Sequence, residues 1–290
     1  MFTAYKYSFP ELILFPPIGF NEERLRERLK GKTILITGAS FGIGESLAYK
    51  LANTGVHLIL VARTAEKLNS IKNKIEKQGG YVSVFPADLS KPAEVAALLP
   101  IIHQLPGGVD IVVNNAGKSI RRSINDSLDR QHDFTRTMAI NYFGPVQLLL
   151  SLIPVLEKNK GHVINISSVS VLLAPAPYWA AYQASKSAFD NWFRCTSPEL
   201  NATGVSTTSI YLPLVKTRMI APTAKYQKMP AMNPDHVAAI ICRAIINKRR
   251  KYAPWWLVFG QLASVIFRYP WEALNTYWLK KKLMDQKQLS

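Results

Sequence analysis

The chain contains 290 residues, of which 48% are apolar and 19% charged, and its formal net charge is +17. This composition suits one α/β domain with a large core, or at most two domains. Two cysteines, Cys195 and Cys242, lie far apart without metal-ligand spacing, which excludes a disulfide framework, and we expect no metal site. The positive charge favours an anionic membrane surface, a phosphorylated ligand or nucleic acid. Because no nucleic-acid motif is present, we expect no nucleic-acid partner.

Residues 1–30 form a leader before the first apolar strand. The stretch MFTAYKYSFPELILFPP lacks a basic region followed by a clean apolar run and a cleavage site. We therefore expect no signal peptide and a cytoplasmic protein. The later stretch NEERLRERLKGK predicts a charged helix.

Short apolar runs alternate with helical patterns through residues 31–252. We predict strands in GKTILITGAS, HLILVAR, YVSVFPADL, VDIVVNNAG, GHVINISSV and VSTTSIYLPL. The stretch AEKLNSIKNKIEKQGG predicts an amphipathic helix with Leu68, Ile71 and Ile75 on one face. Such alternation is typical of a parallel sheet covered on both faces. We therefore predict a single-domain α/β fold with a doubly wound, Rossmann-type parallel sheet and a ligand crevice at the carboxyl ends of the strands.

A glycine-rich turn, TGASFGIG, lies between the first strand and the helical pattern GIGESLAYKLANTG. Gly38, Gly42 and Gly44 permit a tight turn, a close approach of backbone to a pyrophosphate, and close packing of the next helix. The spacing differs by one residue from the commoner dinucleotide fingerprint. Its place between a strand and a helix nevertheless predicts a nucleotide cofactor.

The stretch AAYQASKSAFD places Tyr182 and Lys186 four residues apart, and hence on the same face of a helix. A positive charge beside a phenol favours the phenolate and lowers its pKa, so that the tyrosine can exchange a proton near neutral pH. The alternative is that both residues belong to a solvated helix surface.

Four motifs occur in the order and spacing of the short-chain dehydrogenase/reductase family: TGASFGIG, NNAG, NISS and YQASK. The chain resembles this family over roughly residues 30–250. The resemblance implies an oxidoreductase in which Tyr182 is the catalytic acid/base and Lys186 lowers its pKa and holds the nicotinamide ribose. It further implies that Ser168 polarises the substrate carbonyl and that Asn141 supports a proton-relay water.

The spacing between Ser168 and Tyr182 is fourteen residues, one more than is commonest in the family. A small insertion in VLLAPAPYW is therefore expected. Ser167 and Ser170 are the alternatives for the serine.

The resemblance also implies the cofactor. The second strand is followed by Arg63 and Thr64 where NAD-preferring members usually carry an acid, and a guanidinium there can grip a 2′-phosphate, which implies NADP (NADPH). Phe41 stands where many NADP-dependent relatives have a basic residue, and Leu214 replaces the usual glycine of its loop. The expected cofactor contacts are Gly38, Ser40, Gly42, Ile43, Gly44, Arg63, Thr64, Asp88, Leu89, Asn115, Tyr182, Lys186 and Thr217.

Three basic residues, Lys118, Arg121 and Arg122, follow the fourth strand and are candidates for binding the phosphates of a CoA or phospholipid. With DFTRTMAINYFGPV and the long loop from Tyr211 to Ala238, they resemble bacterial aldehyde-forming fatty acyl-CoA reductases of the family. The resemblance implies an NADPH-dependent reductase of a lipid-like or acyl-CoA carbonyl. Alternatives are a keto-lipid or steroid-type ketone reductase, a non-catalytic cofactor-binding module, and a solvated loop for the basic residues. A homo-oligomer is a further alternative that the sequence leaves open.

Residues 253–290 form a hydrophobic extension with helical periodicity. The stretch PWWLVFGQLASVIF has fourteen residues without a charge, whereas a spanning helix needs about 20. Gln261, Ser264 and Arg268 make a narrow polar stripe, and tryptophans precede the lysines at 280–282. This pattern favours an interfacial helix on an anionic membrane. The alternative is packing over the active site or at a dimer interface.

Overall fold

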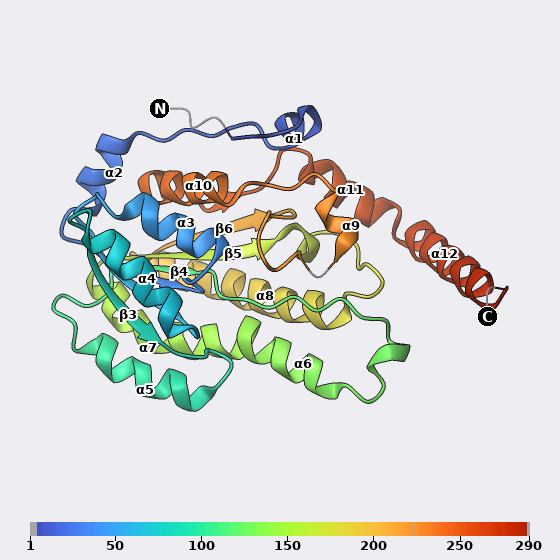
Figure 1. Ribbon diagram of the computed structural model, residues 1–290, viewed down its shortest axis with the longest axis horizontal. Helices are drawn as coiled ribbons and strands as arrows, with labels where there is room; N and C mark the ends of the chain where they lie inside the picture. Colours follow the sequence, from blue (N-terminus) through green and yellow to red (C-terminus); the bar gives the residue numbers. More distant parts are fainter. Residues whose placement is uncertain (1–4, 222, 289–290) are drawn as a thin grey trace.

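A parallel β-sheet of seven strands forms the centre of the molecule (Figure 1), in the order β3-β2-β1-β4-β5-β6-β7. The computed structural model describes residues 5–221 and 223–288. The strands are β1 (Thr33–Thr37), β2 (His57–Ala62), β3 (Tyr81–Pro86), β4 (Ile111–Asn114), β5 (His162–Ser168), β6 (Ser206–Leu212) and β7 (Lys251–Tyr252). The predicted doubly wound, Rossmann-type α/β fold is confirmed. The sequence did not indicate β7, because two residues at a sheet edge give no apolar run.

Alternate strand residues belong to two separate cores, one on each face of the sheet. On one face Ile34 and Ile36 pack with α2 (Glu22–Leu29), α3 (Gly42–Leu51), α4 (Ala65–Glu76) and α10 (Pro234–Asn247). On the other face Leu35 packs with α5 (Pro92–His103), α7 (Gly144–Lys158) and α8 (Ala180–Ala202). The predicted helix α4 buries Leu68, Ile71 and Ile75, as its periodicity required.

The strand order reverses between β1 and β4. At such a switch point the loops that follow the two strands diverge to opposite faces and leave a crevice outside the carboxyl edge of the sheet. The glycine turn follows β1, and the NNAG motif covers the end of β4.

The remaining helices are α1 (Phe9–Leu14), α6 (Gln131–Met138), α9 (Ala224–Gln227), α11 (Leu257–Ile266) and α12 (Arg268–Gln288). Short turns are η1 (Asn125–Ser127), the π-helical η2 (Ala139–Phe143) and η3 (Val169–Val171). Figure 1 shows α1 beside α11, and α12 extending away from the sheet.

One helical run within the described ranges, Gln131–Lys158, is long and apolar enough to cross a membrane by length and composition. It comprises α6, η2 and α7, and it buries Leu148, Leu152 and Leu156 against the sheet. A core helix of a globular domain passes the same test, so this run is weak evidence for a span.

Candidate active site

The glycine turn is closed so tightly that side chains would not fit in it. Gly38 and Gly42 have φ values of +66° and +58°, and a Cβ on Gly44 would lie 2.5 Å from the Gly38 carbonyl oxygen. Helix α3 begins at Gly42, and the residue before it, Phe41, has no side chain that can cap the first turn. The first backbone N–H groups of α3 therefore remain available for an anionic group.

Asn115 supports this turn from the end of β4. Its Nδ2 donates to the carbonyl oxygens of Thr37 and Gly38 at 3.0 and 3.2 Å, and its backbone N–H donates to Thr37 Oγ1. The side chain thus holds β4 to the glycine turn across the switch point. Its predicted contact with the cofactor stays a prediction.

The other expected cofactor residues lie around the same edge. Thr217 packs directly on the turn, since a Cβ on Gly42 would lie 2.8 Å from Thr217 Cγ2. A cavity of about 510 Å³ opens beside them, with Phe41 and Arg218 in its wall. Ser40 and Leu89 are buried and Ile43 packs against the core, so their side chains serve the fold.

Arg63 is the only basic residue between β2 and α4, and its side chain is largely exposed. Its Nη1 lies 3.9 Å from Asp88 Oδ2, which leaves most of the guanidinium unpaired. Thr64 is the N-cap residue of α4. Burial would raise the pKa of Asp88, but hydrogen bonds from Ser90 and the Arg63 charge lower it, so the carboxylate is charged at neutral pH.

Phe41 occupies the position where many NADP-dependent relatives have a basic residue. Two positively charged side chains lie over its ring. The Arg218 guanidinium carbon is 4.1 Å and Lys67 Nζ 5.6 Å from the ring centroid. An aromatic face attracts such cations. The charge that a basic residue would carry at position 41 is therefore supplied by two neighbours.

Ser168, at the end of β5, lies close enough to the half-buried Tyr182 of α8 to influence the pKa of its phenol. The two alternatives for the serine are engaged elsewhere: Ser167 donates to the buried Asp190, and Ser170 donates to Ser168 itself. The geometry therefore favours Ser168 among the three.

We expected Lys186 to lower the pKa of Tyr182, but the structure indicates a raised pKa. Burial raises the pKa of Tyr182, and the Ser168 hydrogen bond opposes this without reversing it. Lys186 Nζ donates to the Ile166 carbonyl oxygen at 3.1 Å, and burial lowers its own pKa to about 8. Burial therefore sets the direction of the shift, and Tyr182 is a protonated phenol at neutral pH.

Asn141 lies in the π-helical turn η2 and joins three parts of the site. Its Oδ1 accepts from the Lys118 N–H, and its Nδ2 donates to the Lys118 carbonyl and to Ser185 Oγ, all at 2.9 Å. A Cβ on Gly117 would lie 3.1 Å from Asn141 Oδ1 and 3.4 Å from Lys186 Nζ. The four predicted catalytic residues therefore lie around the same strand ends.

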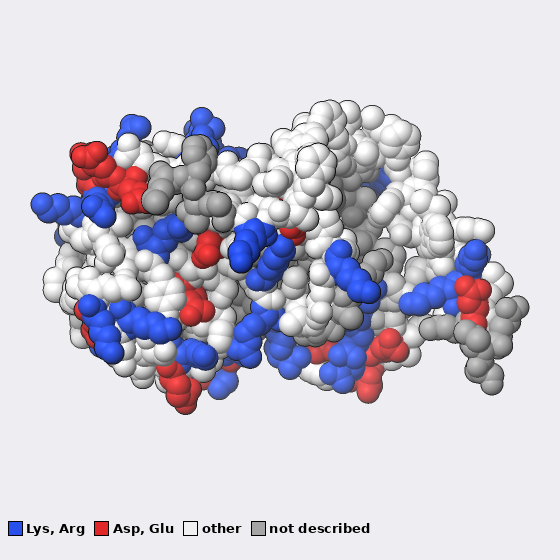
Figure 2. All heavy atoms as spheres, turned by 45° about the horizontal axis from the view of Figure 1, so that its top comes forward, with Lys and Arg blue, Asp and Glu red and all other residues white. Residues whose placement is uncertain are grey.

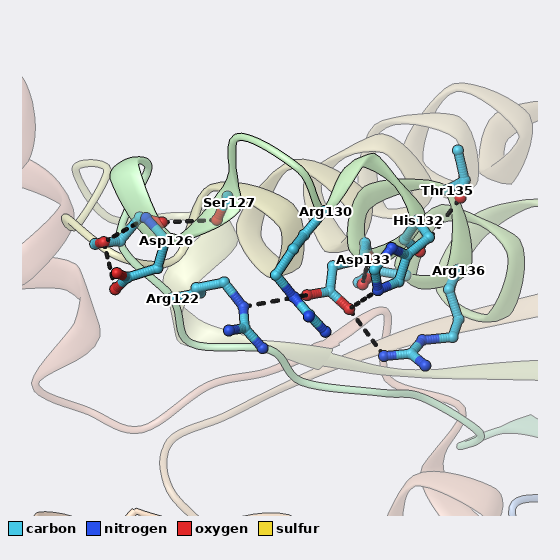
Figure 3. Close-up of polar contacts among 10 residues, drawn as sticks. Arg122, Asp126, Ser127, Arg130, His132, Asp133, Thr135 and Arg136 are labelled. Carbon is cyan, nitrogen blue, oxygen red and sulfur yellow. Dashed lines mark hydrogen bonds and ion pairs between the residues drawn. The ribbon is translucent and has the colours of Figure 1, made fainter.

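The three basic residues after β4 have different environments. Lys118 is half-buried, and burial together with the Arg136 and Arg63 charges lowers its pKa. Arg121 lies over the Tyr178 ring at 4.7 Å, and its charge opposes the rise that burial causes in the pKa of Tyr226. Arg122 pairs instead with Asp133, as Figure 3 shows.

Asp133 on α6 is almost completely buried and holds several cations (Figure 3). The nitrogens of Arg122, Arg130 and Arg136 lie 2.9–3.1 Å from its carboxylate oxygens. One carboxylate cannot neutralise three guanidinium groups, so the cluster remains positive. Arg122 is thus fixed by a structural ion pair, and Arg121 is the better candidate to meet a substrate.

The leader contacts the base of the loop between β6 and α10, which we call its neck. The sequence did not indicate this contact. Val215 and Met232 form an isolated bridge at this neck. Glu11 of α1 is buried there, 2.6 Å from Lys216 Nζ, and accepts from the Ala231 N–H. Burial alone would raise the pKa of Glu11, but hydrogen bonds from Lys216, Ser8 and Ala231 lower it to about 2.

Tyr7 adds a second attachment at the same neck. Its hydroxyl accepts from the Asn233 N–H at 2.8 Å and shares a hydrogen bond of 2.9 Å with His236 Nδ1. Burial lowers the pKa of His236 to about 4, which keeps the imidazole neutral. Lys216 precedes Thr217, so the leader positions the loop that packs on the glycine turn.

The C-terminal extension contacts the segment between Ser168 and Tyr182, where the insertion is expected. Ser264 Oγ accepts from the Ala174 N–H at 2.9 Å, and Trp271 Nε1 donates to the Pro175 carbonyl at 3.1 Å. Lys282 Nζ lies 5.3 Å from the Tyr178 ring. Trp179 then stacks on Tyr226 and meets Tyr182 edge-on. The extension therefore packs against the segment that leads to Tyr182, and packing over the active site stays a prediction.

Comparisons with known proteins agree with this geometry. The family model described as short chain dehydrogenase matches residues 32–228. A fatty acyl-CoA reductase of Acinetobacter baylyi is 47% identical over 85% of this chain and 82% of its own. A fatty acyl-CoA reductase of Mycobacterium tuberculosis is 38% identical over 78% of this chain and 77% of its own. A metagenomic short-chain oxidoreductase, solved in complex with NADP, has a TM-score of 0.68 and 27% identity over 78% of this chain and 97% of its own.

Replacing Glu11 by Gln tests the attachment of the leader. Removal of the buried charge is expected to lower the free energy of unfolding by about 2 kcal/mol at pH 6, as for hydrogen bonds to charged groups. The folded-state pKa of Glu11 is lowered, so its contribution is fully present above its ordinary value of 4.5 and is lost as the pH falls toward 2. Urea unfolding of both proteins between pH 6 and pH 3 should therefore show a difference that shrinks. Glu23→Gln, at an exposed leader position, is the matched control, and a pH-independent difference contradicts the assignment.

Proposed function

The chain belongs to the short-chain dehydrogenase family, and we propose that it is an NADPH-dependent reductase of a lipid-like carbonyl, with a long-chain acyl-CoA as substrate and the aldehyde as product. The observation that carries the proposal is Tyr182, Ser168 and Lys186 at the strand ends, next to the glycine turn. Two relatives named as fatty acyl-CoA reductases support this choice of substrate over a keto-lipid or steroid-type ketone.

NADPH supplies a hydride to the carbonyl carbon when bound. Tyr182 donates its proton to the carbonyl oxygen, and Ser168 donates a hydrogen bond to the same oxygen as charge develops on it. The raised pKa of Tyr182 keeps the phenol protonated, which suits the reductive direction. With a thioester, the product of the first step is a thiohemiacetal, and loss of the thiol gives the aldehyde and free CoA.

The residues around the turn fit an NADP cofactor. The free N–H groups at the start of α3 suit the pyrophosphate, and Thr217, which packs on Gly42, would hold the carboxamide. Arg63 has only one distant carboxylate partner, and Lys67 and Arg218 add positive charge at Phe41. A 2′-phosphate would receive charge-assisted hydrogen bonds from such groups.

The protein is further proposed to be cytoplasmic and peripheral on an anionic membrane through the extension from Ala253 onward. Exposed aromatic residues of α12 precede Lys280, Lys281 and Lys282, a pattern that suits the interface of a bilayer with anionic lipid. Such a location would supply a lipid substrate directly.

Tyr182→Phe tests the reductase proposal. Loss of the acid should lower turnover with NADPH and a long-chain acyl-CoA by roughly 10²–10⁴-fold. NADPH binding, followed by its fluorescence, should persist. Tyr81→Phe, at an exposed position of β3, is the control and should keep full turnover. If wild-type protein oxidises NADPH with neither acyl-CoA nor a keto-lipid, the non-catalytic alternative gains and the proposal fails.

Arg63→Ala tests the choice of NADPH over NADH. Loss of a charge-assisted contact should weaken NADPH binding by about 1.5–3 kcal/mol and leave NADH almost unchanged. Titration calorimetry with both cofactors measures this directly. Equal affinity of the wild-type protein for NADPH and NADH would contradict the assignment.

Arg121→Gln tests whether the basic residues after β4 bind phosphate. The Michaelis constant for an acyl-CoA should rise about tenfold, equivalent to about 1.4 kcal/mol, while that for the matching acyl-pantetheine, which lacks phosphates, should not change. Lys118→Gln should act in the same direction. A parallel rise for both substrates would show that Arg121 only shapes the loop through Tyr178 and Tyr226.

A further inference from the structure

We propose that α1 of the leader and α11 of the extension form one docking surface for an anionic lipid bilayer, so that both ends of the chain contribute to it. This inference rests on the peripheral membrane association proposed above and adds the leader as a second, independent component. We call this region the terminal surface and define it by Phe9, Ile13, Val258, Phe259, Leu262 and Val265.

The six side chains are exposed to an extent that is unusual for large apolar groups. Phe9 is 76% and Ile13 52% exposed, and the four residues of α11 range from 60% to 77%. A contiguous apolar patch on a protein surface marks a site of interaction. Figure 2 shows a broad region without charged groups at the upper right, where α1 and α11 face the viewer.

The two helices are physically joined. Trp255, two residues before the start of α11, donates from Nε1 to the Ile13 carbonyl oxygen at 2.9 Å, and its ring meets Phe259 edge-on. Their apolar residues thus belong to one surface, although α1 and α11 are separated by most of the chain.

Both helices have the reverse of the polarity expected at a water-facing surface. In α1 the carboxylate of Glu11 is buried while Phe9 and Ile13 point outward. In α11 the polar residues Gln261 and Ser264 are half-buried against the protein, and Ser264 bonds to Ala174. An amphipathic helix normally turns its apolar face toward the core. Here the outward face is apolar in both helices, which indicates an apolar environment outside.

Charge and length identify that environment as a bilayer surface. Helix α11 has ten residues, which is too short to span a bilayer and sufficient to lie on one. Helix α12 continues with exposed Trp271 and Trp278 before three exposed lysines at 280–282. Tryptophan prefers the headgroup region, and lysine clusters bind anionic headgroups. A second copy of this chain would have to place the same positive groups opposite one another.

The inner side of the same segment borders the active site. The contacts of Ser264 with Ala174, of Trp271 with Pro175 and of Lys282 with Tyr178 all lie between Ser168 and Tyr182. A bilayer on the terminal surface would therefore adjoin the entrance through which a lipid substrate reaches Tyr182.

The experiment uses full-length protein and vesicles of phosphatidylcholine with or without phosphatidylglycerol. Sedimentation should show binding that requires phosphatidylglycerol and falls in high salt. The double variant Phe9→Asp/Ile13→Asp should lower the partition coefficient at least tenfold while the extension stays intact. Val258→Asp/Leu262→Asp should do the same. The control Ile101→Asp/Leu150→Asp introduces equal charge at exposed apolar positions of α5 and α7 and should bind as wild type.

The outcomes separate this inference from the proposed function. If the α1 variant binds vesicles as wild type does, α1 is not part of the surface and the inference is overturned. The inference is also overturned if the wild-type protein is a dimer in the absence of lipid and the α1 variant is a monomer. Turnover of a soluble short-chain acyl-CoA should be unchanged in the α1 variant. If wild-type protein binds vesicles but reduces no acyl-CoA, the proposed substrate fails and the surface stands.

Discussion

The parallel sheet ends all of its strands at one edge, and the site depends on this constraint. Gly38 follows β1, Asn114 ends β4 and Ser168 ends β5, so groups far apart in sequence meet without any long connection. Polar groups at this edge complete the arrangement, because Asn115 holds β4 to the glycine turn and Asn141 holds the chain after β4 to α8. The cofactor crevice and the clustering of the proposed catalytic residues are two consequences of one topology.

The two terminal segments of the chain contact loops at the carboxyl edge of the sheet. The leader fixes the neck of the β6–α10 loop through Glu11 and Tyr7, and the extension lies along the segment before Tyr182 through Ser264 and Trp271. The Rossmann-type core carries the proposed site residues, whereas the terminal segments contact the chain beside them. Trp255 joins the two segments, so their positions are coupled.

The sequence predicted what depends on local spacing and missed what depends on tertiary contact. The strand periodicity, the glycine turn and the face of α4 follow from neighbours within a few residues. The contact of Glu11 with Lys216 does not, because no pattern relates positions so far apart. Likewise Lys118, Arg121 and Arg122 look equivalent in sequence, yet Arg122 pairs with the buried Asp133, whereas Arg121 only lies over the Tyr178 ring. The pKa of Tyr182 was predicted in the wrong direction because spacing reveals a nearby charge but not the extent of burial.

In α1 and α11 the polar side attaches the helix to the protein, and the apolar side faces outward. Each helix uses its polar side to attach to the protein, with Glu11 at the loop neck and Ser264 at the segment before Tyr182. Leu14 of α1 and Leu257 of α11 add apolar packing on the inner side, and the apolar residues of the terminal surface stay exposed. The alternatives of packing over the active site and lying on a membrane therefore do not compete. The inner face of the extension contacts the segment before Tyr182, and its outer apolar face is exposed.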